Sequence, residues 1–190
     1  GHNYYPEYLW RNGEKVFLNN PSFSPHQRLN GNPLDSALYA AYTGNEYSQQ
    51  LIADEALRYI GENKNQPFFL FLTLTLPHLA LQAPPEMVAR FREAFGDTPY
   101  DGSNGYLPCR FPRATYAAMI TLLDEYVGLI LDELKKQGLD ENTIIIFTSD
   151  NGAAFSTGGA DTKYFGSNDP FRGYKQDLYE GGIHVPFIVR

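Results

Sequence analysis

The sequence predicts an α/β fold in which a largely parallel sheet is flanked by helices. Apolar runs of strand length, "PFFLFLTLTL" and "TIIIFT", alternate with amphipathic segments of helical length. Both runs are apolar at nearly every position, a pattern typical of strands that helices bury on both faces. The chain has 190 residues and is 43% hydrophobic. That suffices for one core, so we expect residues 1–190 to be part of a single domain.

The first half of the chain predicts a hairpin, a helix and a strand. In "YLWRNGEKV", Asn12-Gly13 suits a two-residue type I′ turn between two short strands. A helix is expected over residues 45–63, where Thr43 and Glu46 have the spacing of a capping box. The first apolar run follows this helix directly and forms the first long strand.

The second half predicts two helices and two strands. Pro84 and Pro85 open a short helix that Gly96 closes, since proline is tolerated in the first helical turn. Apolar residues repeat at intervals of three and four between 113 and 137, which predicts a long amphipathic helix. The second apolar run is a buried strand, and "HVPFIVR" is a third strand that its proline confines to an edge or a bulge.

The composition argues against two kinds of partner. The formal net charge is −7 and the pI is about 5.0, whereas a protein that binds nucleic acid independently of sequence needs a basic face. No run of about 18 consecutive apolar residues occurs, so we expect no membrane-spanning segment.

Polar residues stand at the ends of both apolar runs. His78 follows the first, and Asp150-Asn151 follows the second. Ligands of open parallel sheets collect beyond the carboxyl ends of strands, and carboxylate and amide oxygens suit Ca²⁺ or Mg²⁺. Other interpretations stay open at this point: an Asx turn with Gly152 at positive φ, a packed or surface histidine, and a solvated Lys175.

Three motifs in one order carry a family resemblance. "PHLALQAPPE", "FTSDNGA" and "GYKQDLYEGGIHVPFIVR", together with the opening "HNYYPEYLWRNGEKV", resemble the middle segment of the catalytic domain of type I sulfatases. These enzymes form the arylsulfatase branch of the alkaline-phosphatase-like superfamily. The resemblance covers nearly the whole chain, and it implies an incomplete alkaline-phosphatase-like fold.

The resemblance also implies site residues and cofactors. Asp150 and Asn151 match ligands of a calcium ion, for which magnesium is a possible substitute. His78 matches a histidine that hydrogen-bonds the sulfate ester and helps to protonate the leaving oxygen, and Lys175 matches a lysine that binds a sulfate oxygen. The family's formylglycine, made from a cysteine in C-x-P-S-R, and an acidic pair precede the matched region. We therefore expect a longer parent protein to supply them, and this segment alone to be inactive.

Departures from the family pattern are few. His184 stands where arginine is common and is expected to be structural, and Ala80 stands where proline is common. "CRFPR" has the arginine spacing of the modification motif, but Phe111 replaces its proline and the motif lies in the wrong order along the chain. Cys109 is therefore expected to be a loop or core thiol.

Two other functions remain open within this reading. A phosphodiesterase or phosphonate monoester hydrolase of the same superfamily would share the fold and metal site, and a non-catalytic module could bind sulfated glycans without cleaving them. The expected ligand is a sulfated small molecule or glycan, selected by a loop that contains Asp161, Lys163 and Asn168. Family habit implies a periplasmic, secreted or lysosomal location.

Overall fold

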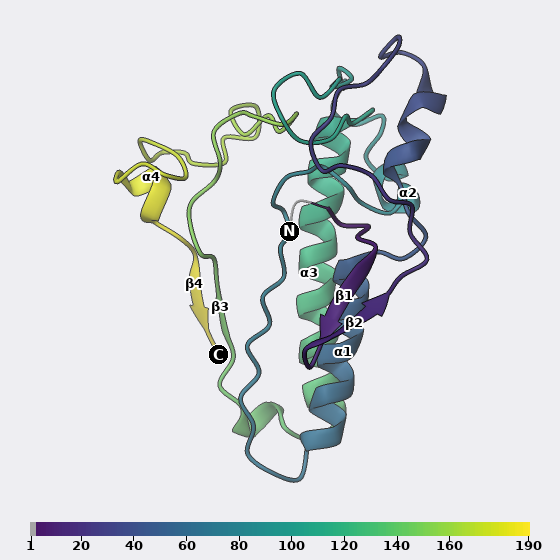
Figure 1. Cartoon of the computed structure of the whole chain (residues 1–190). Helices are drawn as coiled ribbons and strands as arrows, with labels where there is room; N and C mark the ends of the chain where they lie inside the picture. The colour runs from purple at the N-terminus through teal and green to yellow at the C-terminus, as the bar shows by residue number, and fades with distance from the viewer. Residues whose placement is uncertain (1–2) are drawn as a thin grey trace.

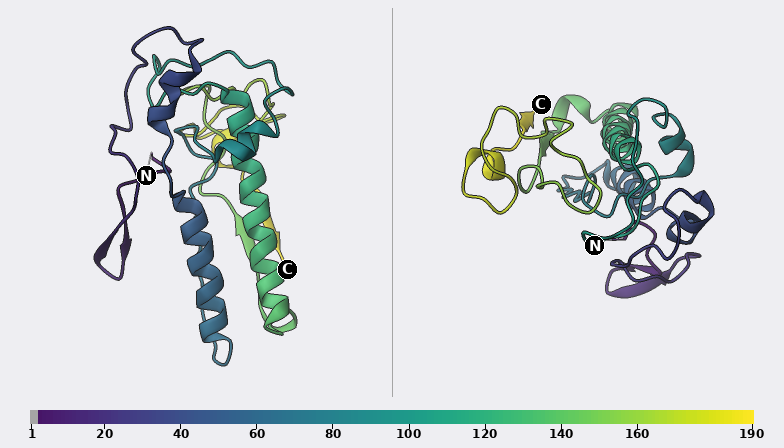
Figure 2. Two further views of the ribbon diagram at one scale, coloured as in Figure 1. Left: turned by 90° about the vertical axis from the view of Figure 1, so that its right-hand side faces the viewer. Right: turned by 90° about the horizontal axis from the view of Figure 1, so that it is seen from above.

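The structure is a computed structural model that describes residues 3–190. Two long helices, α1 (Ser48–Asn63) and α3 (Pro112–Lys136), lie side by side, and the short α2 (Pro85–Ala89) packs against α3 (Figures 1 and 2). Extended segments of the chain run along one side of this helical layer. Two 3₁₀ helices, η1 (Ser36–Tyr42) and η2 (Asp140–Asn142), occupy connecting segments.

The predicted hairpin is confirmed. Strands β1 (Tyr8–Arg11) and β2 (Glu14–Phe17) pair antiparallel. Asn12 and Gly13 between them have φ values of 49° and 87°. A type I′ turn requires positive φ at both central positions, which explains why asparagine and glycine stand there.

Helix α1 begins three residues later than predicted, and the capping box does not form. The carboxylate of Glu46 accepts a hydrogen bond from the backbone of Asn19 instead. The Asn20 side-chain oxygen accepts from the N–H groups of Asn45 and Glu46 at 2.8 and 2.9 Å. A residue distant in sequence therefore satisfies the backbone donors that a local cap would have taken.

Helix α3 confirms the most regular helical pattern of the sequence. Its first turn is capped from outside, because the two carboxylate oxygens of Asp97 accept from the N–H groups of Arg113 (2.6 Å) and Ala114 (3.0 Å). Gly138 follows the last turn at φ 69°, the left-handed conformation that commonly ends a helix. The predicted second helix is shorter than its pattern, since α2 ends at Ala89.

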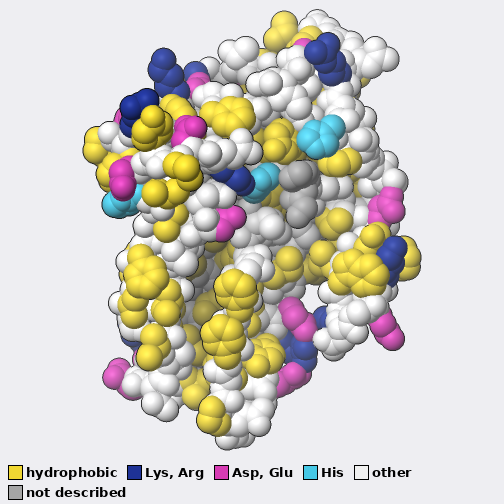
Figure 3. All heavy atoms as spheres, turned by 60° about the vertical axis from the view of Figure 1, so that its left-hand side comes forward, with side chains coloured by type: hydrophobic (Ala, Val, Ile, Leu, Met, Phe, Trp, Pro, Cys, Tyr) yellow, Lys and Arg dark blue, Asp and Glu magenta, His cyan; other side chains and the backbone are white. Residues whose placement is uncertain are grey.

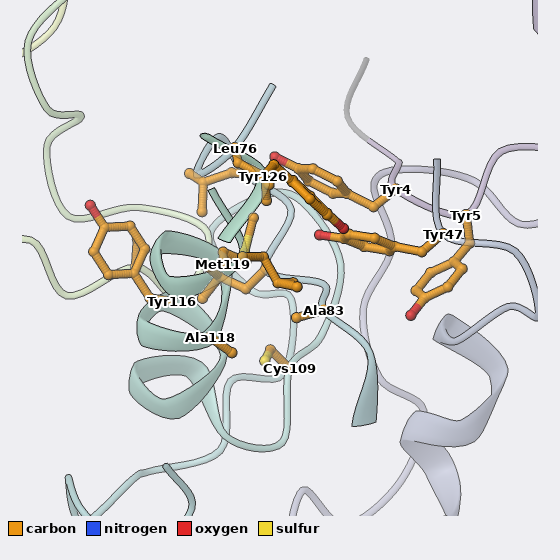
Figure 4. Close-up of a cluster of buried hydrophobic side chains, with 14 of the residues drawn as sticks. Tyr4, Tyr5, Tyr47, Leu76, Ala83, Cys109, Tyr116, Ala118, Met119 and Tyr126 are labelled. Carbon is orange, nitrogen blue, oxygen red and sulfur yellow. The ribbon is translucent and has the colours of Figure 1, made fainter. Parts of the chain in front are cut away.

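The core lies between α3 and the N-terminal segment and is rich in tyrosine (Figure 4). The rings of Tyr4 and Tyr47 stack with centroids 5.7 Å apart, and Tyr5 tilts against Tyr47 at 5.3 Å. Burial raises the pKa of all three hydroxyls. The Tyr4 hydroxyl lies 2.9 Å from the carbonyl of Thr75 and 2.7 Å from that of His78. The core is thus attached directly to the loop that carries the predicted histidine.

The predicted parallel sheet is not seen among residues 3–190. The two sheets present there have two strands each and are both antiparallel: the hairpin, and β3 (Ile146–Thr148) paired with β4 (Phe187–Val189). The edge strand predicted at the C-terminal end is therefore confirmed. Residues 67–74 run extended, and within the described chain their backbone groups form no hydrogen bond to another strand.

Burial along residues 67–74 explains this difference. Half-buried and exposed positions alternate, so that Phe68 and Leu70 are half-buried whereas Phe69 and Phe71 are 84% and 77% exposed. This is the two-residue period of a strand that covers the helical layer with one face. A continuous apolar run does not reveal that its second face is left open in this chain.

Among the described residues, α3 is the one helix long and apolar enough to cross a membrane by length and composition. In this structure 39% of its most apolar window is buried inside the molecule, where it packs against α1 and α2. The core helix of a soluble protein passes the same test. The expectation that no segment spans a membrane therefore stays a prediction.

Candidate active site

Two loops that are distant in sequence meet backbone to backbone. The loop after β3 carries the two predicted metal ligands, and the segment before α4 (Glu180–Ile183) carries the predicted lysine. The N–H of Lys175 donates to the carbonyl of Ala153 at 2.8 Å, and the N–H of Gly152 donates to that of Gly182 at 3.0 Å. The structure therefore brings the predicted lysine and the predicted metal ligands onto adjoining backbone.

Glycines make this close approach possible. A Cβ atom at Gly152 would lie 2.0 Å from the carbonyl oxygen of Gly181, and one at Gly181 would lie 2.1 Å from that of Gly173. A Cβ at Gly182 would lie 2.2 Å from the carbonyl oxygen of Asp177. Gly152 does not have positive φ. Close backbone contact, and not a left-handed turn, therefore explains why glycine stands at this position.

The side-chain oxygen atoms of Asp150 and Asn151 could coordinate a metal ion. Asp150 is exposed, and Asn151 is half-buried with its Nδ2 donating to the carbonyl of Gly152 at 2.9 Å. Neither the Asp150 carboxylate nor Asn151 Oδ1 accepts a hydrogen bond from another described residue, so the Asx turn does not form. Two hard oxygen donors fit part of a calcium or magnesium site. Residues 3–190 contain no group of three or more histidine, cysteine or acidic side chains that could complete it.

His78 lies on a separate loop that fixes its ring. Its N–H donates to the carbonyl of Thr75 at 2.8 Å, and its Nδ1 lies 2.5 Å from the carbonyl oxygen of Leu79. A carbonyl oxygen only accepts, so Nδ1 carries the proton in this contact. Within residues 3–190, no hydrogen bond or ion pair joins His78 to Asp150, Asn151 or Lys175.

Tyr106, an aromatic neighbour of His78, and His26, which contacts Tyr106, were not predicted from the sequence. The ring of Tyr106 meets that of His78 edge to face, with centroids 6.2 Å apart. The N–H of Tyr106 donates to Nδ1 of His26 at 3.0 Å, and these two rings lie 5.0 Å apart. Neither residue lies in a periodic pattern. Tyr106 has φ 64°, an unusual conformation for an aromatic residue that sequence does not reveal.

Some residues of the loop predicted to select the substrate form bonds within the protein itself. Asp161 accepts from Arg113 at 2.8 Å, and the Arg113 guanidinium lies 3.8 Å from the centroid of the Tyr164 ring. The hydrogen bond from Arg113 lowers the pKa of Asp161. The Asn168 side chain likewise forms hydrogen bonds to the backbone of Ala153 and Gly173. Lys163 is exposed, and with Arg172 it lines a cavity of about 430 Å³ in this loop.

Cys109 and His184 have the surroundings of structural residues. The Cys109 thiol is buried and donates to Thr115 Oγ1 at 3.3 Å, and burial raises its pKa to about 11. The expected core thiol is thereby confirmed. His184 contacts the Glu180 carboxylate at 2.8 Å and stacks on Phe171 at 4.3 Å between centroids, so that it packs the segment around α4.

Comparison with known proteins assigns the family. The family model described as Sulfatase matches residues 2–190. The chain belongs to the sulfatase family. Steryl-sulfatase of Rattus norvegicus is 34% identical over 143 residues, which cover 74% of this chain and 21% of that protein. N-acetylgalactosamine-6-sulfatase of Rattus norvegicus is 32% identical over 150 residues, covering 77% of this chain and 24% of that protein. This sulfatase chain thus spans about a fifth to a quarter of the length of these relatives.

A solved structure agrees with the family. Ps i-CgsB, in complex with k-i-k-neocarrahexaose, is similar with a TM-score of 0.61 and 31% identity, over 77% of this chain and 28% of that one. The resemblance drawn from the three motifs is therefore confirmed for this sulfatase chain. The comparisons leave the roles of individual residues as predictions.

Proposed function

We propose that the full-length parent protein of this chain is a sulfuric ester hydrolase that acts with calcium on a sulfated carbohydrate or aryl sulfate. The observation that carries the proposal is the backbone junction between the Asp150–Asn151 loop and Lys175, found in a chain that the sulfatase family model matches over residues 2–190. The junction places two hard oxygen donors and a cation on adjoining backbone. An anionic ester with a divalent cation is the ligand that such a pair suits.

Each predicted residue has a task in this chemistry. Asp150 and Asn151 would hold the divalent ion, calcium or magnesium, which supplies positive charge to neutralise the sulfuryl oxygens. Lys175 binds one sulfuryl oxygen and stabilises the charge that builds up in the transition state. The formylglycine and the remaining metal ligands would come from the part of the parent outside this chain. Residues 1–190 alone are therefore expected to lack activity.

His78 is suited to the leaving-group side of the reaction. In the proposed reaction Nδ1–H stays bonded to the Leu79 carbonyl, 2.5 Å away, and Nε2 faces the ester. In the imidazolium form Nε2 donates a proton to the oxygen that leaves with the alcohol. The Tyr4 hydroxyl donates to the backbone carbonyl of His78 at 2.7 Å. This hydrogen bond ties the loop to the aromatic core and limits its movement.

Several observations favour a sugar as the substrate. One relative is named for N-acetylgalactosamine 6-sulfate chemistry, and the solved neighbour holds a neocarrahexaose. Lys163, Arg172 and Asp169 line a cavity in the loop before Lys175, and the two basic side chains outnumber the one carboxylate, which suits an anionic substrate. A periplasmic, secreted or lysosomal location belongs to the same proposal and rests on the family resemblance.

The test is a substrate panel with the full-length parent protein. We expect hydrolysis of an aryl sulfate and of sulfated oligosaccharides, loss of activity on chelation of calcium, and formylglycine in peptide mass mapping. A preference for phosphate diesters or phosphonate monoesters, without formylglycine, would replace the proposal with a phosphoryl hydrolase. Binding of sulfated glycans without turnover would indicate a binding module. The family match gives neither alternative specific support.

A further inference from the structure

We infer that Asn168 is a positioning residue that holds the metal-ligand loop against the lysine segment, an inference that rests on the proposed function. Its Oδ1 accepts from the N–H of Ala153 at 3.2 Å, and its Nδ2 donates to the carbonyl of Gly173 at 2.5 Å. Ala153 lies two residues after Asn151, and Gly173 lies two residues before Lys175. One side-chain amide therefore joins the two loops that carry the proposed chemistry.

The peptide at Ala153 is held from both sides. Its N–H is bonded to Asn168, and its carbonyl accepts from the N–H of Lys175 at 2.8 Å. The backbone of Asn168 is itself held, because its carbonyl accepts from the N–H of Phe171 at 2.6 Å. Phe171 in turn stacks on His184. The Asn168 amide thus fixes the backbone at Ala153 relative to the packed loop that contains Phe171.

Only an amide side chain of this length satisfies both contacts. Asparagine offers one acceptor and one donor group, whereas an ionised aspartate could accept from Ala153 but could not donate to Gly173. Asn168 is half-buried, and water would compete for either group if the side chain were removed. Losing the amide leaves two direct backbone bonds across the junction, Lys175 to Ala153 and Gly152 to Gly182. The junction persists but becomes looser.

A looser junction should affect chemistry more than folding. Residues that orient metal ligands from outside typically change metal affinity or activity by about 10–100-fold when they are replaced. Displacements of the order of 1 Å at a reacting centre have comparable effects. Asn168 borders the cavity of this loop, but both hydrogen bonds of its side chain go to backbone groups, so we expect it to act through the placement of Asp150, Asn151 and Lys175.

The test is Asn168→Ala in the full-length parent protein, with aryl sulfate turnover measured in two backgrounds. We expect kcat/KM to fall about 10-fold in the wild-type background. With calcium saturating in both backgrounds, the same change should cost less than about 2-fold in a Lys175→Ala background, because residues that act through one another are not additive. A merely structural role would give equal factors in both backgrounds, and that result would overturn the inference.

Asn20→Ala is the matched control. Asn20 is also a half-buried asparagine whose amide joins separate segments, with its Oδ1 accepting from Asn45 and Glu46 and its Nδ2 donating to the carbonyl of Pro6 at 2.9 Å. Its removal should lower the thermal midpoint while leaving kcat/KM within about 2-fold of the wild type. An equal kinetic loss in both variants would mean that general loosening explains the effect of Asn168.

Calcium affinity gives a readout that does not depend on turnover. Titration calorimetry of the metal-free parent with calcium should show a dissociation constant about 10-fold higher for Asn168→Ala and unchanged for Asn20→Ala. A parent that hydrolyses no sulfate ester but shows this shift would refute the proposed function and keep the positioning role. An active parent whose Asn168→Ala variant matches the wild type in calcium affinity and kcat/KM would refute the positioning role alone.

Discussion

Gly152 shows at the scale of one residue how the site constrains the sequence. Its position after Asp150 and Asn151 looks like turn chemistry, but its φ is not positive. The space for a side chain is taken by the carbonyl of Gly181, which belongs to a segment some thirty residues away. The sequence could indicate that Asp150, Asn151 and Lys175 belong together only through the family resemblance, because the contact that joins them is made by backbone.

Replacing Gly152 by alanine should therefore destabilise the protein. The added Cβ would lie 2.0 Å from the Gly181 carbonyl oxygen, and relieving such overlap costs about 1–3 kcal/mol of unfolding free energy. Gly128→Ala is the control, since a Cβ at this position in α3 meets nothing within 4 Å and should stabilise by up to about 1 kcal/mol. Urea unfolding measures both. Equal stability of the two variants would contradict the backbone junction.

Cys109 gives a pH-dependent prediction. Burial raises the pKa of its thiol from 9.0 to about 11, so the folded state keeps the proton more tightly than the unfolded state. The resulting stability is fully present below pH 9 and is lost as the pH rises through about 11. The difference in unfolding free energy between wild type and Cys109→Ala should shrink across that window. A difference that stays constant with pH would mean that the thiol is not buried as the structure has it.

At the scale of elements, periodicity predicted the helices well and their beginnings poorly. The repeat of apolar residues in α3 depends on local geometry that the sequence contains. The cap of α3 comes from Asp97, 15 residues before its first residue, and Asn20 holds the chain just before α1 from 28 residues before Ser48. Side chains so far away in sequence leave no mark in a local pattern. The contacts of Tyr106 with His78 and His26 were not predicted for the same reason.

Asp97→Ala tests the cap of α3. The two carboxylate oxygens of Asp97 satisfy the N–H groups of Arg113 and Ala114, and losing such a cap typically costs about 1–2 kcal/mol. Asp124→Ala removes the same charge from an exposed position within α3 and should change stability by less than about 0.5 kcal/mol. Thermal unfolding followed by circular dichroism at 222 nm compares them. The capping role fails if the two variants melt together.

At the scale of the whole molecule, one face is more apolar than a surface usually is. Figure 3 shows hydrophobic side chains gathered over the extended segments on the side opposite the helical layer. They come from residues 67–74, from the segment just before β3 and from the two strands of the second sheet: Phe69, Phe71, Ile144, Ile146, Phe187, Ile188 and Val189. Sequence reasoning expected helices on both faces of these strands. The strand predicted over the first apolar run is not formed, since residues 67–74 run extended without pairing to another strand of the described chain, and helices cover one of their faces.

We propose that Asp150 and Asn151 hold a metal ion beside Lys175, and the metal content of the purified protein tests this proposal. Full-length wild type and two variants would be purified in calcium, passed through a desalting column and analysed by atomic emission. Asp150→Ala removes a proposed ligand, whereas Glu141→Ala removes an exposed carboxylate in η2, before β3. We expect about one calcium per molecule in the wild type and in Glu141→Ala, and clear loss in Asp150→Ala. Unchanged calcium in Asp150→Ala would contradict the account.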